Sequence, residues 1–161
     1  MKVYLDMDGV IADFFDAAAR INADRCVTWR DMEHRDQARA IKHIRNVDGF
    51  FENLKPFPMA NTLVKSIVNL AGGYTILSSP LQGHETCEKE KIAWVRKHLH
   101  TQPDSIVITD DKPRFAEGNI LIDDYGYNIV NWERCGGYGI KYQADEDPIT
   151  TALVPLQTLL S

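Results

Sequence analysis

The feature that most constrains the fold is an alternation of short apolar runs with segments of helical periodicity. Five apolar runs are predicted to be strands, at residues 2–5, 74–77, 105–108, 119–122 and 139–142. Between them, apolar residues recur at helical spacing, as in Leu63, Ile67 and Leu70, and a last helix is expected after Pro148. Strands that alternate with helices indicate βα units and a parallel sheet, so we expect an α/β fold.

One connection is too long to be an ordinary βα loop. The chain between residues 16 and 60 leaves the first strand and starts no further sheet unit, whereas such loops usually span about 2–6 residues. The segment is rich in arginine, and one helical stripe in it is formed by Ala38, Ile41, Ile44 and Val47. We expect residues 16–60 to form a small helical lobe over the mouth of the sheet, and residues 1–15 and 61–161 to form the core domain.

Composition and charge limit the partners of the chain. Of its 161 residues, 44% are hydrophobic and 25% are charged, which is a globular balance, and the formal net charge is −5. Proteins that grip long nucleic acid usually show a basic excess, so we expect a small ligand instead. Three widely spaced cysteines favour reduced thiols over a disulfide framework or a zinc site. Without a signal peptide or a membrane-spanning apolar run, we expect a cytoplasmic monomer or homodimer with no membrane partner.

The strongest chemical signal follows the first predicted strand. Asp6 and Asp8 stand two residues apart where the strand ends, and Gly9 then allows the backbone to turn sharply. Neighbouring carboxylates raise each other's pKa unless a cation is present, and parallel α/β sheets bind ligands at the carboxyl ends of their strands. A solvated acidic turn is the ordinary explanation of a bare Asp-x-Asp, but the strand context and the residues below outweigh it.

A second acidic pair, Asp123 and Asp124, closes the fourth predicted strand. Because the carboxyl ends of parallel strands lie on one edge of a sheet, these acids can reach the same pocket as Asp6 and Asp8. The four carboxylates would form an oxygen-rich cluster suited to a hard, hydrated cation such as Mg²⁺.

Hydroxyl and cationic side chains follow two other strands. Ser78 and Ser79 come after the second one, where a hydroxyl and free backbone N–H groups make a phosphate seat, although a helix-capping serine is an equally good explanation. Lys112 follows the third strand and can balance the acids and bind a phosphoryl oxygen, with Lys91 as a rival cation on the preceding helix. Apart from Lys91, the charged run at 88–91 is predicted to be a solvated helix face, and the histidines are predicted to lie on the surface.

The order of these motifs resembles that of the haloacid dehalogenase (HAD) superfamily. Asp-x-Asp-Gly-Val, Ser-Ser-Pro, a lysine and Asp-Asp follow one another as the four motifs of that superfamily do. The match is closer to the 5′(3′)-deoxyribonucleotidases, whose characteristic segments are similar to residues 6–14, 50–56, 90–95 and 121–124. The resemblance implies a Rossmann-like three-layer α/β/α core with a small helical cap inserted after the first strand. It also implies a magnesium-dependent phosphomonoesterase.

The resemblance also implies roles for individual residues. Asp6 would be the nucleophile that becomes phosphorylated, and Asp8 the general acid and base. Magnesium would be held by Asp6, Asp8 and Asp124, with support from Asp123. The residues expected to bind the phosphate or the rest of the substrate are Ser78, Ser79, Lys91, Lys112, Phe14, Phe50 and Phe51. The three phenylalanines could stack on a base, or they could pack in the core under the cap.

Two positions depart from the nucleotidase pattern. Related nucleotidases carry an arginine where this chain has Asp110, and a lysine shortly after the Ser-Pro turn where it has Gln82. Both changes remove positive charge near the expected pocket, so the motifs predict the hydrolytic chemistry but do not decide which substrate is preferred. The expected substrate is a deoxyribonucleoside 5′(3′)-monophosphate. The alternatives are an HAD phosphatase for a sugar phosphate or a polynucleotide 3′-phosphate end, and a non-catalytic binding protein on the same fold.

Overall fold

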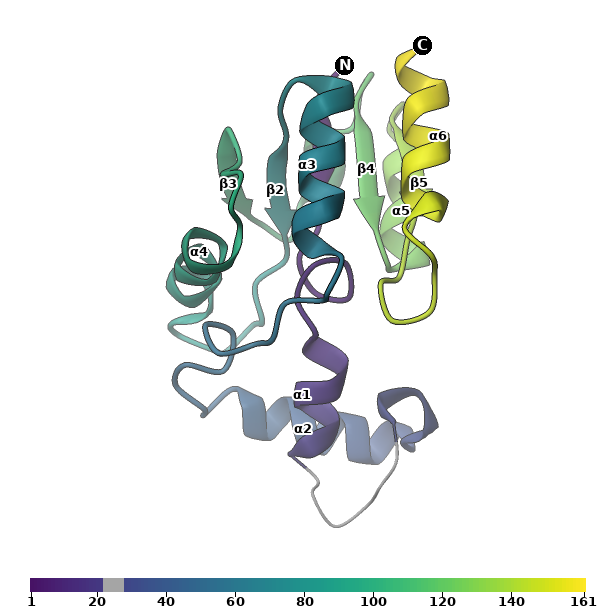
Figure 1. The fold of residues 1–161 in the computed structure, drawn as a ribbon. Coiled ribbons are helices and arrows are strands. Elements are labelled where there is room, and N and C mark those ends of the chain that lie inside the picture. Colours follow the sequence, from purple (N-terminus) through teal and green to yellow (C-terminus); the bar gives the residue numbers. More distant parts are fainter. Residues whose placement is uncertain (22–27) are drawn as a thin grey trace.

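A five-stranded parallel sheet forms the centre of the molecule (Figure 1). The structure is a computed structural model that describes residues 1–21 and 28–161. The strands are β1 (Val3–Leu5), β2 (Thr75–Ser78), β3 (Ser105–Ile108), β4 (Ile120–Asp123) and β5 (Tyr138–Lys141). They lie in the order β3-β2-β1-β4-β5, and every neighbouring pair is parallel. The predicted α/β fold with a parallel sheet is therefore confirmed, and each strand lies within one residue of its expected place.

Helices cover both faces of the sheet. One face carries α3 (Ala60–Ala71), α4 (Cys87–His98) and α6 (Thr150–Leu160), and the other carries α5 (Gly126–Arg134) and the 3-10 helix η2 (Lys112–Phe115). Side chains alternate between the two faces along a strand. Leu5 of β1 accordingly packs in the larger core under α3, α4 and α6, while its neighbour Tyr4 packs in the smaller core with Trp132 of α5. These are the three layers expected from the sequence.

A small helical cap follows β1 at the lower end of the view in Figure 1, towards which the strands point. It contains α1 (Phe14–Arg20), the 3-10 helix η1 (Trp29–Asp31) and α2 (His34–Ile44). Helix α2 buries Ala40 and Ile44, whereas Ala38 is exposed, so the predicted apolar stripe was wrong at that position. Arg25 and Cys26 lie outside the described residues. The boundaries expected for the cap, 16 and 60, stay a prediction.

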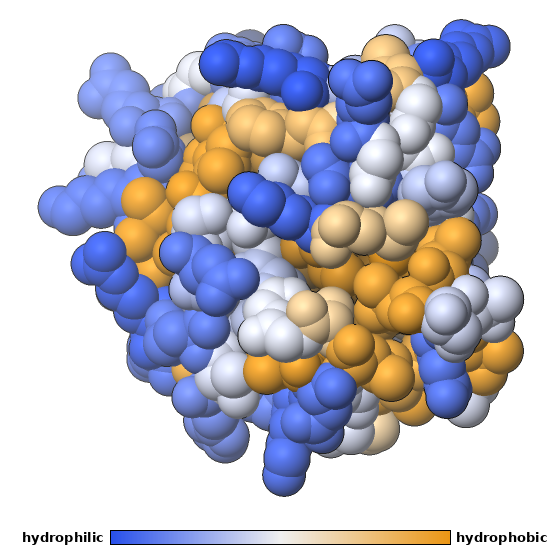
Figure 2. All heavy atoms as spheres, turned by 90° about the horizontal axis from the view of Figure 1, so that it is seen from above, coloured by the Kyte–Doolittle hydropathy of each residue, from blue (hydrophilic) through white to orange (hydrophobic). Residues whose placement is uncertain are grey.

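The opposite end of the molecule, where both termini lie, is seen in Figure 2. Hydrophobic side chains gather there in patches between hydrophilic ones, and Met1 is among the large hydrophobic residues that are exposed. Within the described residues, no helix combines the length and the hydropathy that a bilayer crossing requires. Cys87 is buried, Cys135 is exposed, and neither forms a disulfide.

Candidate active site

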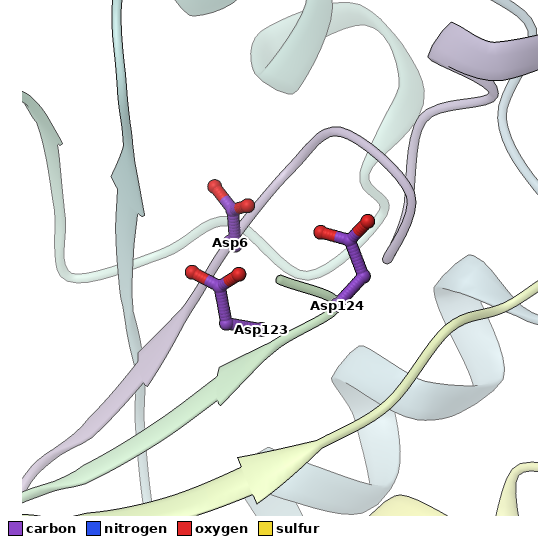
Figure 3. A group of neighbouring side chains, drawn as sticks. All are labelled: Asp6, Asp123 and Asp124. Atoms are coloured by element: carbon purple, nitrogen blue, oxygen red, sulfur yellow. The ribbon is translucent and has the colours of Figure 1, made fainter. Parts of the chain in front are cut away.

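Three aspartates meet at the carboxyl ends of the central strands (Figure 3). β1 and β4 are neighbours, and the backbone N–H of Asp6 donates to the carbonyl of Ile122 over 3.0 Å. This register places Asp6 beside Asp123 and Asp124. One carboxylate oxygen from each of the three lies within 4.8 Å of the others, a geometry in which they could hold one metal ion. The convergence predicted for these acids is therefore seen, while their chemical roles stay predictions.

Gly9, in the turn after β1, leaves the space that the side chain of Asp124 occupies. Its φ of +79° lies in the left-handed region that favours glycine. A Cβ atom at this position would lie 2.5 Å from Oδ2 of Asp124 and 2.9 Å from the ring of Phe15. The backbone N–H of Ala144 donates to the Gly9 carbonyl over 2.9 Å, which ties the loop after β5 to this turn. Glycine is therefore required here both by the turn and by the neighbouring acid.

Crowding raises the proton affinity of the acids. Burial, together with the charges of Asp6 and Asp123, raises the pKa of Asp124 to about 8. Burial and Asp6 raise the pKa of Asp123 to about 6, although Lys112 opposes the shift. Carboxylates that share a site cannot all ionise cheaply. A divalent cation would relieve this repulsion, which makes the cluster a candidate metal site.

Lys112 forms ion pairs with two of these acids, Asp6 and Asp123. Its ammonium nitrogen lies 3.0 Å from Oδ1 of Asp6 and 2.7 Å from Oδ2 of Asp123. Burial alone would lower the pKa of Lys112, but the two carboxylates raise it above its usual value. Asp123 also accepts hydrogen bonds from the Asn128 side chain (3.0 Å) and the Tyr125 backbone N–H (2.9 Å). No sequence pattern indicated Asn128, the third residue of α5, as a partner of Asp123.

Lys91 reaches the same site from α4. Its ammonium group donates to Oδ2 of Asp8 (2.7 Å), to Oγ of Ser78 (2.9 Å) and to the Ser79 carbonyl (2.8 Å). The sequence offers Lys91 and Lys112 as alternative cations, and the structure places both beside the catalytic candidates, Lys91 at Asp8 and Lys112 at Asp6. Ser79 contributes its backbone oxygen to this contact, whereas Ser78 contributes its hydroxyl.

The three candidate aromatic residues pack against one another under the cap. Phe50 and Phe51 are buried and Phe14 is half-buried. The rings of Phe14 and Phe51 are nearly parallel, with centroids 6.3 Å apart, and Trp29 of the cap lies 5.8 Å from Phe14. This is the core packing that the sequence left open as an alternative. Stacking on a base stays a prediction.

Two predictions of exposure were wrong. Glu90 is only 5% exposed, and its carboxylate accepts the backbone N–H groups of Gly49 and Phe51. His84 is 6% exposed, and its Nε2 lies 2.9 Å from the Val47 carbonyl, to which it donates because a carbonyl only accepts. A signal for Glu90 was present, because it lies four residues before the apolar Trp94 and so shares its helix face.

The two departures from the nucleotidase pattern touch each other. The side-chain amide of Gln82 donates to the carboxylate of Asp110, and Arg45 donates to the Gln82 backbone carbonyl over 2.8 Å. A second contact between cap and core is formed by Arg30, whose guanidinium lies 2.9 Å from carboxylate oxygens of both Asp145 and Glu146. Neither contact was predicted from the sequence.

Comparisons with known proteins find nucleotidases among the sequence relatives and an HAD-superfamily hydrolase among the similar structures. Residues 1–146 match the family described as 5′ nucleotidase, deoxy (pyrimidine), cytosolic type C. The human cytosolic 5′(3′)-deoxyribonucleotidase is 32% identical, with 77% of this chain and 70% of the relative covered. The mouse mitochondrial 5′(3′)-deoxyribonucleotidase is 34% identical, with 77% and 64% covered. In fold, an HAD-superfamily hydrolase from Ehrlichia chaffeensis matches with a TM-score of 0.61 at 13% identity, over 99% of this chain and 97% of that one.

Proposed function

Because the chain belongs to the 5′(3′)-deoxyribonucleotidase family of HAD hydrolases, we propose that it releases phosphate from deoxyribonucleoside 5′(3′)-monophosphates with Mg²⁺ as cofactor. The family makes it a phosphoric monoester hydrolase that acts on nucleotides. The observation that carries the finer proposal is the meeting of Asp6, Asp123 and Asp124 with two buried lysines at one edge of the sheet. Its substrates would be small nucleotides of the cytoplasm, not long nucleic acid.

The acidic cluster suits a hard divalent cation. Carboxylate oxygens are the ligands that Mg²⁺ prefers, and Asp6, Asp124 and the backbone carbonyl of Asp8 would provide them. Asp123 is already held by Lys112, Asn128 and a backbone N–H, so it would support the ligands from behind. When bound, Mg²⁺ would offset the negative charge of the transferring phosphoryl group.

Asp6 would attack the phosphorus atom of the substrate. An Asp6 oxygen forms a bond to phosphorus while the ester oxygen of the nucleoside leaves, which gives an aspartyl-phosphate. Water then attacks this phosphorus, and the bond to Asp6 breaks to release inorganic phosphate. Lys112 lies 3.0 Å from Asp6 and would orient its carboxylate. Lys91 and Ser78 would bind phosphoryl oxygens, as would Lys112.

Asp8 would move the protons of both steps. It would protonate the leaving ester oxygen in the first step and remove a proton from water in the second. Burial raises the pKa of Asp8, against the opposing charge of Lys91, and Asp6 raises it further. A carboxyl group whose pKa is raised by burial can hold a proton nearer to neutral pH, as a general acid must.

The test is phosphate release from a panel of deoxynucleoside monophosphates, ribonucleotides and sugar phosphates, with Mg²⁺ and with EDTA. We expect Mg²⁺-dependent release that favours the deoxynucleoside monophosphates and is abolished in Asp6→Asn. Asp104→Asn, which removes an exposed aspartate just before β3 and so at the end of the sheet opposite the cluster, is the control and should retain activity. Release confined to sugar phosphates would refute the substrate, and substantial activity in Asp6→Asn would refute the mechanism.

A further inference from the structure

Lys91 is held more completely than a lysine in a phosphate site needs to be. It is 1% exposed, and an ammonium group has three N–H donors, all of which are used by Asp8, Ser78 and Ser79. In addition, its nitrogen lies over the ring of Phe51, 5.0 Å from the centroid. A cation at this distance is attracted by the negative face of an aromatic ring, most strongly where water is excluded.

The ring of Phe51 is held in place by the residue that precedes Lys91. Glu90 accepts the backbone N–H of Phe51 over 2.9 Å and that of Gly49 over 2.8 Å, and the hydroxyl of Thr86 donates to it as well. Burial would raise the pKa of Glu90, but these hydrogen bonds lower it below its usual value, so the carboxylate is charged. Gly49 has a φ of +78°, which gives the turn the shape that aims both N–H groups at one carboxylate.

We propose that Glu90 and Phe51 are positioning residues for Lys91. Glu90 fastens the segment at 49–51 to α4, and Phe51 then presents its ring face to the ammonium group. A lysine side chain is long and flexible, so without this support its nitrogen would sample positions off the phosphate seat, at a cost in rate. This inference rests on the proposed function, in which Lys91 exchanges one of its oxygen partners for a phosphoryl oxygen of the substrate.

The same arrangement links Lys91 to the cap. Phe14, the first residue of α1, lies nearly parallel to Phe51, at 13° between ring planes. A displacement of α1 would therefore shift the ring of Phe51, which contacts Lys91. An apolar ring that merely fills space beside Lys91 would produce the same contacts. A test must therefore change the charge distribution of the Phe51 ring while its size stays nearly the same.

Stepwise fluorination of the ring of Phe51 makes this separation. Each fluorine weakens the negative ring face while the shape changes little, so the contact with the ammonium group weakens in steps. From the mono- to the trifluorinated residue we expect kcat/KM to fall progressively, by about tenfold in total, with an unchanged unfolding midpoint. The matched control is the same series at Phe57, a buried ring that takes part in none of the cation–ring contacts within the described ranges.

Glu90→Gln tests the other half of the inference. The amide keeps one acceptor oxygen but loses the second and the charge, so the segment carrying Phe51 is held less firmly. We expect kcat/KM to fall in Glu90→Gln. In this variant, kcat/KM should also depend much less on the number of fluorines at position 51, because the effects of coupled residues are not additive. An active wild-type enzyme with a flat Phe51 series would overturn the inference. A wild-type enzyme that releases no phosphate would instead refute the proposed function.

Discussion

Replacing Asp124 with asparagine should stabilise the metal-free protein while it removes activity. The carboxylate of Asp124 lies beside those of Asp6 and Asp123, and this crowding raises its pKa to about 8. An acid whose pKa is higher in the folded state destabilises the fold at every pH above its unfolded pKa of about 4; the destabilisation grows as the pH rises and levels off above the folded pKa. Asparagine has nearly the same shape but no charge, so the repulsion is absent at every pH.

The size of the effect follows from the separation of the charges. Two carboxylate oxygens 4.8 Å apart repel one another by about 3 kcal/mol at an effective dielectric constant of about 20. Lys112 offsets part of this repulsion from 3.0 Å away. A net gain of about 1–3 kcal/mol at pH 9 would raise the unfolding midpoint by roughly 3–8 °C for a domain of this size.

The assay is thermal unfolding of wild type and Asp124→Asn at pH 9 and pH 6, each with EDTA and with Mg²⁺. With EDTA, the variant should be more stable than wild type at pH 9, and its advantage should be smaller at pH 6, because the destabilisation by Asp124 shrinks as the pH falls from about 8 towards the unfolded pKa of about 4. With Mg²⁺ at pH 9, wild type should gain stability because the cation binds the folded state, and the variant should gain much less. Asp48→Asn, an exposed aspartate, controls for loss of a charge as such.

The reasoning would be refuted by a metal-free variant that is less stable than wild type at pH 9. It would also be refuted if Mg²⁺ stabilised both proteins equally, because Asp124 would then contribute nothing to binding the cation. A stability gain combined with loss of phosphate release would show that the acids of this cluster are placed for function at a cost in stability.

Other perturbations have equally definite outcomes. Mg²⁺ affinity should rise with pH up to about 8, as Asp124 loses its proton, and titration calorimetry that finds equal affinity at pH 6 and pH 9 would contradict this. Gly9→Ala would place a Cβ 2.5 Å from Asp124, so steady-state kinetics should show kcat/KM lowered by about 100-fold; a value near wild type would mean that the acid can move freely. Arg30→Gln should change kcat/KM by less than about fivefold, and in high salt the wild type should approach the variant, since partly exposed ion pairs are weak and screened.

The sheet and its acids could be predicted because they depend on local sequence. Each strand is a short apolar run, and parallel strands bring their carboxyl ends to one edge, so Asp6 and Asp123 could be expected on the same edge; that their strands β1 and β4 are neighbours is seen only in the structure. The small apolar core on the second face of the sheet follows in the same way from the alternation of side chains, as Tyr4 and Leu5 illustrate.

Contacts between distant segments could not be predicted in this way. Arg30 and Asp145 are separated by 115 positions, and no local pattern connects a 3-10 helix of the cap with the loop after β5. Glu90 presents a different difficulty, because in sequence it is one of four alternating charges, of which the first two are exposed and the last two buried. The spacing of four residues from Trp94 places Glu90 on the buried face of α4, but only the packing of α4 against the segment at 49–51 supplies the backbone N–H groups that its carboxylate binds.

The most direct test of the proposed mechanism is to trap phosphate on Asp6. The enzyme would be mixed with Mg²⁺ and a deoxynucleoside monophosphate that carries a radiolabelled phosphate, quenched in acid, digested and separated into peptides. The mechanism predicts label on the peptide that contains Asp6, formed and lost at rates consistent with turnover and missing in Asp6→Asn. Turnover without label on this peptide, or label on another residue, would contradict it.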